Sequence, residues 1–154
     1  MPEKQTIERA RRDKRAGKAA STQAGEFIRE EMHHIREGKH GARSARQAIA
    51  IGLSKARRAG VDLAPPREGK ASTKTRKSAQ RAYALGHGAA PRRKPTAKRA
   101  QASEKALRRE GRSAAGHAAL ARHSRTSARM RSPAARSAAA RKAAHTRASR
   151  HDHA

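Results

Sequence analysis

Large apolar side chains are scarce in this 154-residue chain, and most of them gather in one short segment. Only 16 hydrophobic residues are larger than alanine, and nine of these lie between residues 27 and 63. Isoleucine, leucine, valine and phenylalanine supply 12 residues in all, far below the roughly 20% under which highly charged chains are typically disordered. We therefore expect one small core around residues 27–63 and no core that spans the whole chain.

The charge is strongly positive and unevenly distributed. Lysine and arginine number 39 against 12 aspartate and glutamate, a formal net charge of +27, of which residues 1–63 carry +7 and residues 64–154 carry +20. Such self-repulsion predicts a polyanionic partner. Two prolines after Ala64 interrupt any helix at the boundary. These patterns predict a small helical head over 1–63, a proline-rich linker over 64–71 and a cationic low-complexity arm over 72–154.

Several classes of protein are disfavoured. The chain has no cysteine, which removes disulfides, thiolate metal sites and a cysteine nucleophile. Its first residues are charged and it has no apolar run long enough to span a bilayer, so we expect a cytoplasmic protein, in the nucleoid if DNA is its partner, with no membrane association. We find neither paired carboxylates in an apolar setting nor a glycine-rich phosphate loop, and we expect no enzyme activity and no small-molecule substrate.

Three helices are expected in the head, over residues 6–16, 21–38 and 44–59. The second should begin with Ser21 or Thr22 as its N-cap and end at Gly38. Its apolar residues fall on one face at helical spacing: Ala24, Phe27, Ile28, Met32 and Ile35. Glu31 interrupts this stripe. It either pairs with an arginine of the first or third helix or lies at the exposed end of the stripe.

The third helix has clear start and stop signals. Ser44 and Gln47 have the spacing of a capping box, and Gly60 suits the left-handed position that closes a helix, with Val61 placed to contact Ala56. A helical wheel places small apolar residues on one side: Ala45, Ala48, Ile49, Gly52, Ala56 and Ala59. The opposite side is basic and polar: Arg43, Arg46, Gln47, Ala50, Ser54, Arg57 and Arg58.

The predicted fold class is all-α, a mini-domain with a helix-turn-helix-like helix pair followed by a largely disordered, conditionally helical basic tail. Residues 72–85, closed by Gly86, and residues 103–109 favour two further helices. From Gly111 onward the sequence has low complexity and is rich in alanine, arginine and serine. We expect this part to be disordered in isolation and helical when its charge is neutralised.

The third helix and one short arm contain the candidate nucleic-acid-binding residues. Arginine and glutamine at the start of the helix suit base edges, and the basic residues at its end suit phosphates. A second candidate is the cationic run between Pro91 and Pro95, which suits either a minor-groove arm or a basic linker. The full set is Arg43, Arg46, Gln47, Lys55, Arg57, Arg58, Arg92, Arg93 and Lys94.

Histidines invite a metal interpretation. His33 and His34 follow Glu30 and Glu31, which gives the Glu-x-x-His pattern twice, but adjacent helical residues diverge by 100° and no second helix carries a matching pattern. We therefore predict no metal site and no cofactor. Only two aromatic residues are present, which disfavours single-strand binding by base stacking.

The segment STQAGEFIREEMHHIREGKHGARSARQAIAIGLSKARRAGV, residues 21–61, resembles the shared core of an uncharacterised family of small, strongly basic bacterial proteins. Weaker similarity continues through KASTKTRKSAQRA and LRREGRSAAGHAAL. Some members of that family are labelled DNA-binding, but the family implies no established activity or site residues. The tail is similar to the alanine-rich basic tails of bacterial histone-like proteins.

These observations predict a histone-like, nucleoid-associated protein that contacts the phosphate backbone non-specifically or with weak specificity, with double-stranded DNA as the favoured partner. Structured RNA, including RNA of the ribosome, is one alternative. The other is a protein-interaction module that uses the stripe of Phe27, Ile28, Met32 and Ile35, with a second copy of the chain as one partner, so a homo-oligomer stays open.

Overall fold

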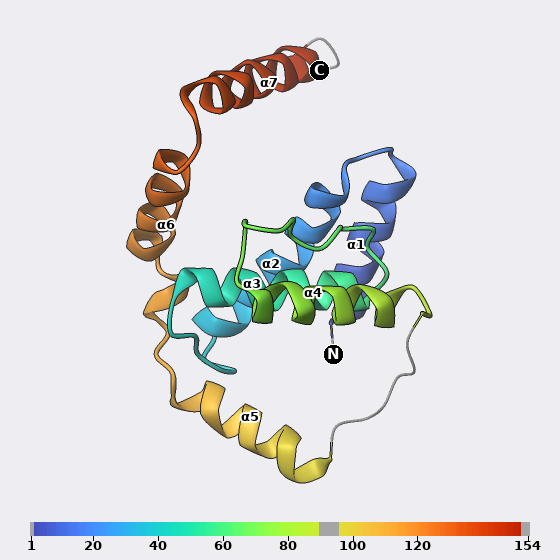
Figure 1. Cartoon of the computed structure of the whole chain (residues 1–154), viewed down its shortest axis with the longest axis vertical. Helices are drawn as coiled ribbons and strands as arrows, with labels where there is room; N and C mark the ends of the chain where they lie inside the picture. Colours follow the sequence, from blue (N-terminus) through green and yellow to red (C-terminus); the bar gives the residue numbers. More distant parts are fainter. Residues whose placement is uncertain (1, 90–95, 152–154) are drawn as a thin grey trace. The chain divides into compact units, whose positions relative to one another are not determined.

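The computed structural model describes residues 2–89 and 96–151, the last three of these as backbone only, and all regular structure in these ranges is helical (Figure 1). The elements are α1 (Lys4–Arg15), α2 (Ala20–Arg36), α3 (Ala45–Arg58), α4 (Thr73–Gly86), α5 (Ala97–Arg109), a 3₁₀ turn η1 (Ser113–Ala115), α6 (His117–Arg129) and α7 (Pro133–His151). The all-helical prediction is confirmed. The chain divides into two compact units at Gly116.

Local capping signals explain the ends of α3. The Ser44 hydroxyl accepts a hydrogen bond from the Gln47 backbone nitrogen at 3.2 Å. At the other end Gly60 has φ +87°, and the amides of Gly60 and Val61 donate to the carbonyls of Arg57 and Ala56, which is the Schellman pattern. The predicted helix and both of its ends are confirmed.

The start of α2 differs from the prediction. The helix begins at Ala20, its N-cap is Ala19, and no side chain caps it. Ser21 and Thr22 lie inside the first turn. The Gln23 side chain donates to the Lys18 carbonyl at 2.8 Å, which ties this first turn to the α1–α2 connection in place of a hydroxyl cap.

The core of the first unit lies where α2 packs against α1 and α3. Phe27 and Ala24 of α2 meet Ala10 of α1 and Ala56 and Val61 at the end of α3. Met32 and Ile35 are also buried, and Ile28 is half-buried. The predicted stripe is therefore core. Most of the buried apolar residues in the described part are alanines, so close approach of helices substitutes for large side chains.

The first unit extends past residue 63. Helix α4 lies beside α3 and runs in the same direction (Figure 1), with Ala79 and Ala82 buried. Its Gly86 lies so close to the Arg57 carbonyl that a Cβ there would overlap it. Gly86 thus belongs to the helix, and the left-handed closing residue is Gly88 with φ +74°. The closing glycine predicted from the sequence is wrong by two positions.

A second segment of the predicted arm also packs on the head. The amides of Gly41 and Ala42 donate to the carbonyls of Leu107 and Gly111, and Ala114 and Ala115 are buried beside α2 and α3. This docking carries the compact unit to Gly116, well beyond the boundary expected at residue 63. Helix α5, which ends at this segment, begins six residues earlier than predicted.

The second unit contains α6 and α7, so this part of the predicted disordered tail is mostly helical. Alanine has the highest helix propensity of all residues. The Ser132 hydroxyl accepts from the Ala135 amide at 3.2 Å, and Pro133 occupies the first helical position, where proline is favoured. No described side chain of α6 or α7 is buried, so local preferences and not a core favour these helices.

One prediction follows from the contact between α4 and the end of α3. The Tyr83 hydroxyl donates to Asp62 Oδ1 at 2.6 Å, and this bond, with desolvation and the carboxylate charge, raises the pKa of the phenol above its usual 10.0. Tyr83 is the only tyrosine and the chain has no tryptophan, so phenolate absorbance reports this group alone. We expect a titration midpoint above 10.0, lowered in Asp62→Asn.

The sign of the linked stability effect follows from that shift. The folded state favours the neutral phenol, so this contribution is fully present below the ordinary pKa and is lost as pH rises through the raised value. A midpoint at or below 10.0 in the wild type would contradict the docking of α4 described above.

Candidate nucleic-acid interface

The outward face of α3 is basic at both ends and small in the middle. Arg43, Arg46 and Arg58 are exposed, and none of their side chains pairs with a carboxylate in the described ranges. Between them Ala50 is exposed and Ser54 is half-buried. Arg46 and Arg58 are twelve residues apart, about 18 Å along the helix axis. The guanidinium groups thus lie on either side of two small residues, Ala50 and Ser54.

Gln47 has a structural role in the cap of α3. Its Oε1 accepts from the Arg43 backbone nitrogen at 2.9 Å, one residue before the Ser44 amide that a capping box would use. The side-chain oxygen is thereby engaged, and the amide nitrogen is left as a donor. This bond fixes the backbone that presents Arg43.

Arg57 does not lie on the exposed face, and the prediction that it does is wrong. Its side chain is buried, with 7% of the residue exposed, and it donates from Nε to the Leu63 carbonyl at 3.0 Å and from Nη2 to the Ala64 carbonyl at 3.2 Å. Burial lowers the pKa of this guanidinium. Because α4 packs against α3, the chain returns over Arg57, and the residue anchors the segment predicted as a linker.

Lys55 likewise turns toward the interior. Its Nζ lies 2.7 Å from Glu31 Oε2 and 3.4 Å from Glu30 Oε1. The partner of Glu31 is therefore a lysine of the third helix, whereas the sequence left open an arginine or an exposed position. Because two carboxylates neutralise the Lys55 ammonium group, we expect Lys55 to contribute little to the binding of a polyanion.

Three predicted residues, Arg92, Arg93 and Lys94, lie outside the described residues. Further exposed cations of the described part lie on other helices. The exposed basic residues of α1 and α4 include Arg11, Arg15, Lys74, Lys77 and Arg81.

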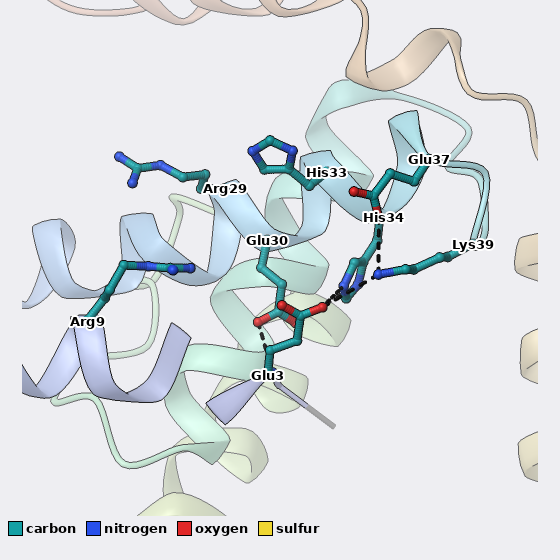
Figure 2. Close-up of a pocket in the computed structure, with 8 residues that line it drawn as sticks. All are labelled: Glu3, Arg9, Arg29, Glu30, His33, His34, Glu37 and Lys39. Atoms are coloured by element: carbon teal, nitrogen blue, oxygen red, sulfur yellow. Dashed lines mark hydrogen bonds and ion pairs between the residues drawn. The ribbon is translucent and has the colours of Figure 1, made fainter. Parts of the chain in front are cut away.

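Glu3, Glu30 and Glu37 lie with His34 and Lys39 in a polar cluster (Figure 2). Glu26 pairs with Arg9 at 2.8 Å. Glu3 Oε1 lies 2.9 Å from His34 Nε2 and 3.5 Å from Lys39 Nζ, and the hydrogen bond from His34 is the main cause that lowers the pKa of Glu3. The cluster lines a cleft of about 260 Å³.

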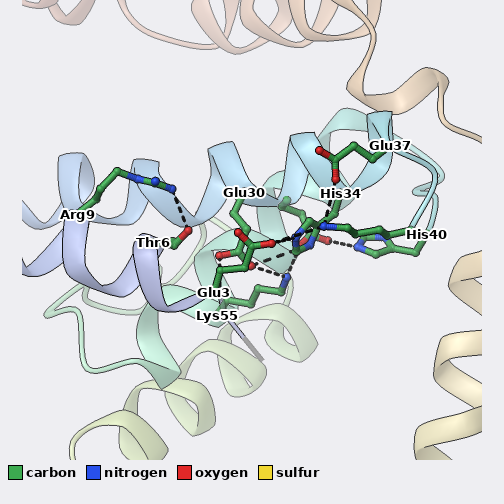
Figure 3. A network of polar contacts seen from close by, with 10 residues as sticks. Glu3, Thr6, Arg9, Glu30, His34, Glu37, His40 and Lys55 are labelled. Carbon is green, nitrogen blue, oxygen red and sulfur yellow. Dashed lines mark hydrogen bonds and ion pairs between the residues drawn. The ribbon is translucent and has the colours of Figure 1, made fainter.

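The cluster continues to His40 in the loop after α2 (Figure 3) and to the buried Glu31. His40 Nε2 lies 3.3 Å from Glu31 Oε1, and His40 Nδ1 lies 3.1 Å from the Gly41 carbonyl. The Glu-x-x-His pattern in the sequence pointed to His33 and His34 with Glu30 and Glu31 and gave no sign of His40. Its spacing of six residues after His34 is not a helical one, and only the turn at Gly38 brings it back.

No protein-family model, curated protein or solved structure matches this chain. Among the described residues, we find no helix that is both long enough and apolar enough to cross a bilayer.

Proposed function

We propose that this protein binds nucleic acid through phosphate contacts, non-specifically or with weak specificity, and that double-stranded DNA is its main partner. The observation that supports this most is the separation of charge in the first unit. Glu30 and Glu31 are buried and paired with Lys55, whereas Arg43, Arg46 and Arg58 face solvent and have no carboxylate partner among the described residues. Unpaired exposed arginines leave a surface that a polyanion can neutralise.

The α3 face suits a helix that lies along a groove. Arginine forks bind phosphate oxygens in pairs, and the two basic ends of α3 are about 18 Å apart. Ala50 and Ser54 between them allow the backbone to approach closely. Helices α2 and α3 are consecutive, packed together and joined by residues 37–44, so we interpret them as a helix-turn-helix-like pair with α3 as the contacting helix.

The second unit adds positive charge and contributes no acidic residue between residues 117 and 151. Residues 117–151 contain arginine and lysine but no aspartate or glutamate, and the described side chains of α7 are exposed. Helices of this composition repel one another and gain from neutralisation by phosphates, so we propose that they order or extend along DNA on binding. A histone-like role in the nucleoid fits this arrangement, as does membership of the basic bacterial family that the sequence resembles.

The alternative function, a protein-interaction module, needs the apolar stripe of α2 to be accessible to a partner. Phe27, Met32 and Ile35 are buried within the first unit, with 1%, 6% and 0% of each residue exposed. A partner could reach them only by unfolding α2. Structured RNA remains the competing polyanion, and competition between duplex DNA and structured RNA at matched salt separates the two.

The first test is the salt dependence of binding. If the protein neutralises about eight phosphates, log K should fall against log salt with a slope near −7. We expect this slope by fluorescence anisotropy on both random and A·T-rich duplexes. A slope of only about −1 or −2 would refute backbone binding as the main function.

The second test locates the contact surface. Arg43→Ala/Arg46→Ala should reduce the slope by about 2 on both duplexes, because two phosphate contacts are lost. The matched control is Arg11→Ala/Arg15→Ala, which removes the same charge from exposed positions on α1. An equal reduction in both variants would mean that total charge, and not the α3 face, determines binding. Loss on one duplex alone would indicate groove readout.

A further inference from the structure

The turn after α2 brings together three side chains whose types are common metal ligands. One ligand atom each from Glu31, His34 and His40 lies within 4.8 Å of the others. Glu31 and His34 are one turn apart on α2, and Gly38, with φ +78°, reverses the chain so that His40 returns to them (Figure 3). Local helix geometry and a single turn therefore assemble the set.

The hydrogen bond of His40 Nδ1 leaves Nε2 as the ring nitrogen that could bind a cation. Nδ1 lies 3.1 Å from the Gly41 carbonyl, which can only accept, so Nδ1 carries the hydrogen. In the neutral ring Nε2 then has a lone pair, and it lies 3.3 Å from Glu31 Oε1, which is also an acceptor. A carbonyl that fixes the ring in this way is the usual outer partner of a metal-binding histidine.

The distance between these two acceptors fits a shared ion. Tetrahedral zinc with bonds of about 2.0–2.1 Å to nitrogen and oxygen separates its ligand atoms by about 3.3 Å. The same separation is found between His40 Nε2 and Glu31 Oε1. In the neutral ring these two lone pairs repel each other, and a cation between them would remove that repulsion.

Glu31 supplies an independent indication. Its side chain is completely buried, and neither carboxylate oxygen has a hydrogen-bond partner in the part of the chain that the structure describes. Lys55 Nζ forms an ion pair with Oε2 and leaves Oε1 facing His40. A buried carboxylate oxygen without a donor is costly, and a metal ion would satisfy it.

The surroundings are negative in a protein that is otherwise strongly positive. Four carboxylates, those of Glu3, Glu30, Glu31 and Glu37, outnumber the two lysines that contact them, Lys39 and Lys55. Glu3 contacts His34 directly at the rim of the cluster, 2.9 Å away, so a carboxylate lies beside the histidine on the solvent side.

We propose that Glu31, His34 and His40 bind one divalent transition-metal ion, with zinc the best match to two imidazoles and a carboxylate. The ion would join the last turn of α2 to the loop at His40, three residues before Arg43. Its effect is structural, because it holds the loop from which α3 begins. The proposal is independent of nucleic-acid binding.

The test is zinc binding to the full chain by isothermal titration calorimetry. The background protein carries His151→Gln/His153→Gln, which removes a terminal His-Asp-His sequence that could bind zinc weakly. In this background we expect one ion per chain and a higher melting temperature with zinc. His40→Gln should weaken binding by more than about 100-fold, the upper range for losing even an outer-shell partner. His33→Gln, an exposed neighbour, should bind as before.

If His40→Gln does not fold, NMR of the histidine rings in the background protein tests the proposal without that variant. Zinc should shift the ring NMR signals of His34 and His40 and leave those of His33 in place. Absence of stoichiometric binding, unchanged affinity in a folded His40→Gln, or equal shifts at His33 would each overturn the proposal.

Discussion

Replacement of Lys55 by methionine is expected to lower the free energy of unfolding by about 3–5 kcal/mol. Lys55 Nζ lies 2.7 Å from the completely buried carboxylate of Glu31 and 3.4 Å from Glu30. Methionine retains most of the side-chain volume but removes the charge. Glu31 would then be a buried anion without its closest cation, which costs far more than loss of an exposed ion pair.

Urea unfolding followed by far-UV circular dichroism, with a chelator present, measures this effect. The control is Arg46→Met, which removes the same charge from an exposed position of the same helix and should change stability by no more than about 0.5 kcal/mol. The double variant Glu31→Gln/Lys55→Met should recover much of the loss, because both charges are removed. Equal stabilities of the two single variants would contradict the inward placement of Lys55.

The second large effect concerns two glycines that occupy helix interiors. An alanine Cβ at Gly52 of α3 would lie 2.8 Å from the Ile28 Cα and 3.1 Å from the Ile28 nitrogen of α2. The backbone of one helix would have to move, and overpacking of this kind costs about 1–3 kcal/mol. Gly52→Ala should therefore destabilise the protein, even though alanine favours helix by up to about 1 kcal/mol.

Gly25 of α2 provides the matched control. A Cβ at this position would meet nothing within 4 Å, so Gly25→Ala keeps the propensity gain and should stabilise by up to about 1 kcal/mol. The same denaturation experiment should give opposite signs for the two substitutions. Stabilisation by both would mean that α2 and α3 do not approach at Gly52.

The helices of the head could be predicted because their signals are local. The serine cap and the glycine that closes α3 act within one turn, and the apolar spacing of α2 follows from the helical period alone. Signals were weaker for α4, where a second glycine two positions later closes the helix. In the tail the alanine content favoured helix and the charge favoured disorder, and composition gave no way to rank the two.

The candidate site was only partly predictable, because only some of its residues are positioned by local interactions. The outward positions of Arg46 and Arg58 follow from their angle around α3, whereas Arg43 precedes the N-cap Ser44. Arg57 lies within the basic arc of the wheel, but α4 and the returning chain cover it. His40 joins Glu31 and His34 through a turn, so no periodic pattern could indicate it.

The sequence by itself determined the helical class, the ends of α3, the location of the core and the large excess of positive charge. These properties depend on residue composition and on interactions within a few residues. The tertiary structure alone decided which cations are free. Lys55 and Arg57 are basic like Arg58 and lie within one turn of it, yet of the three only Arg58 is exposed to solvent. A helical period gives each side chain a direction, but tertiary packing decides whether water, a carboxylate or a backbone carbonyl lies in that direction.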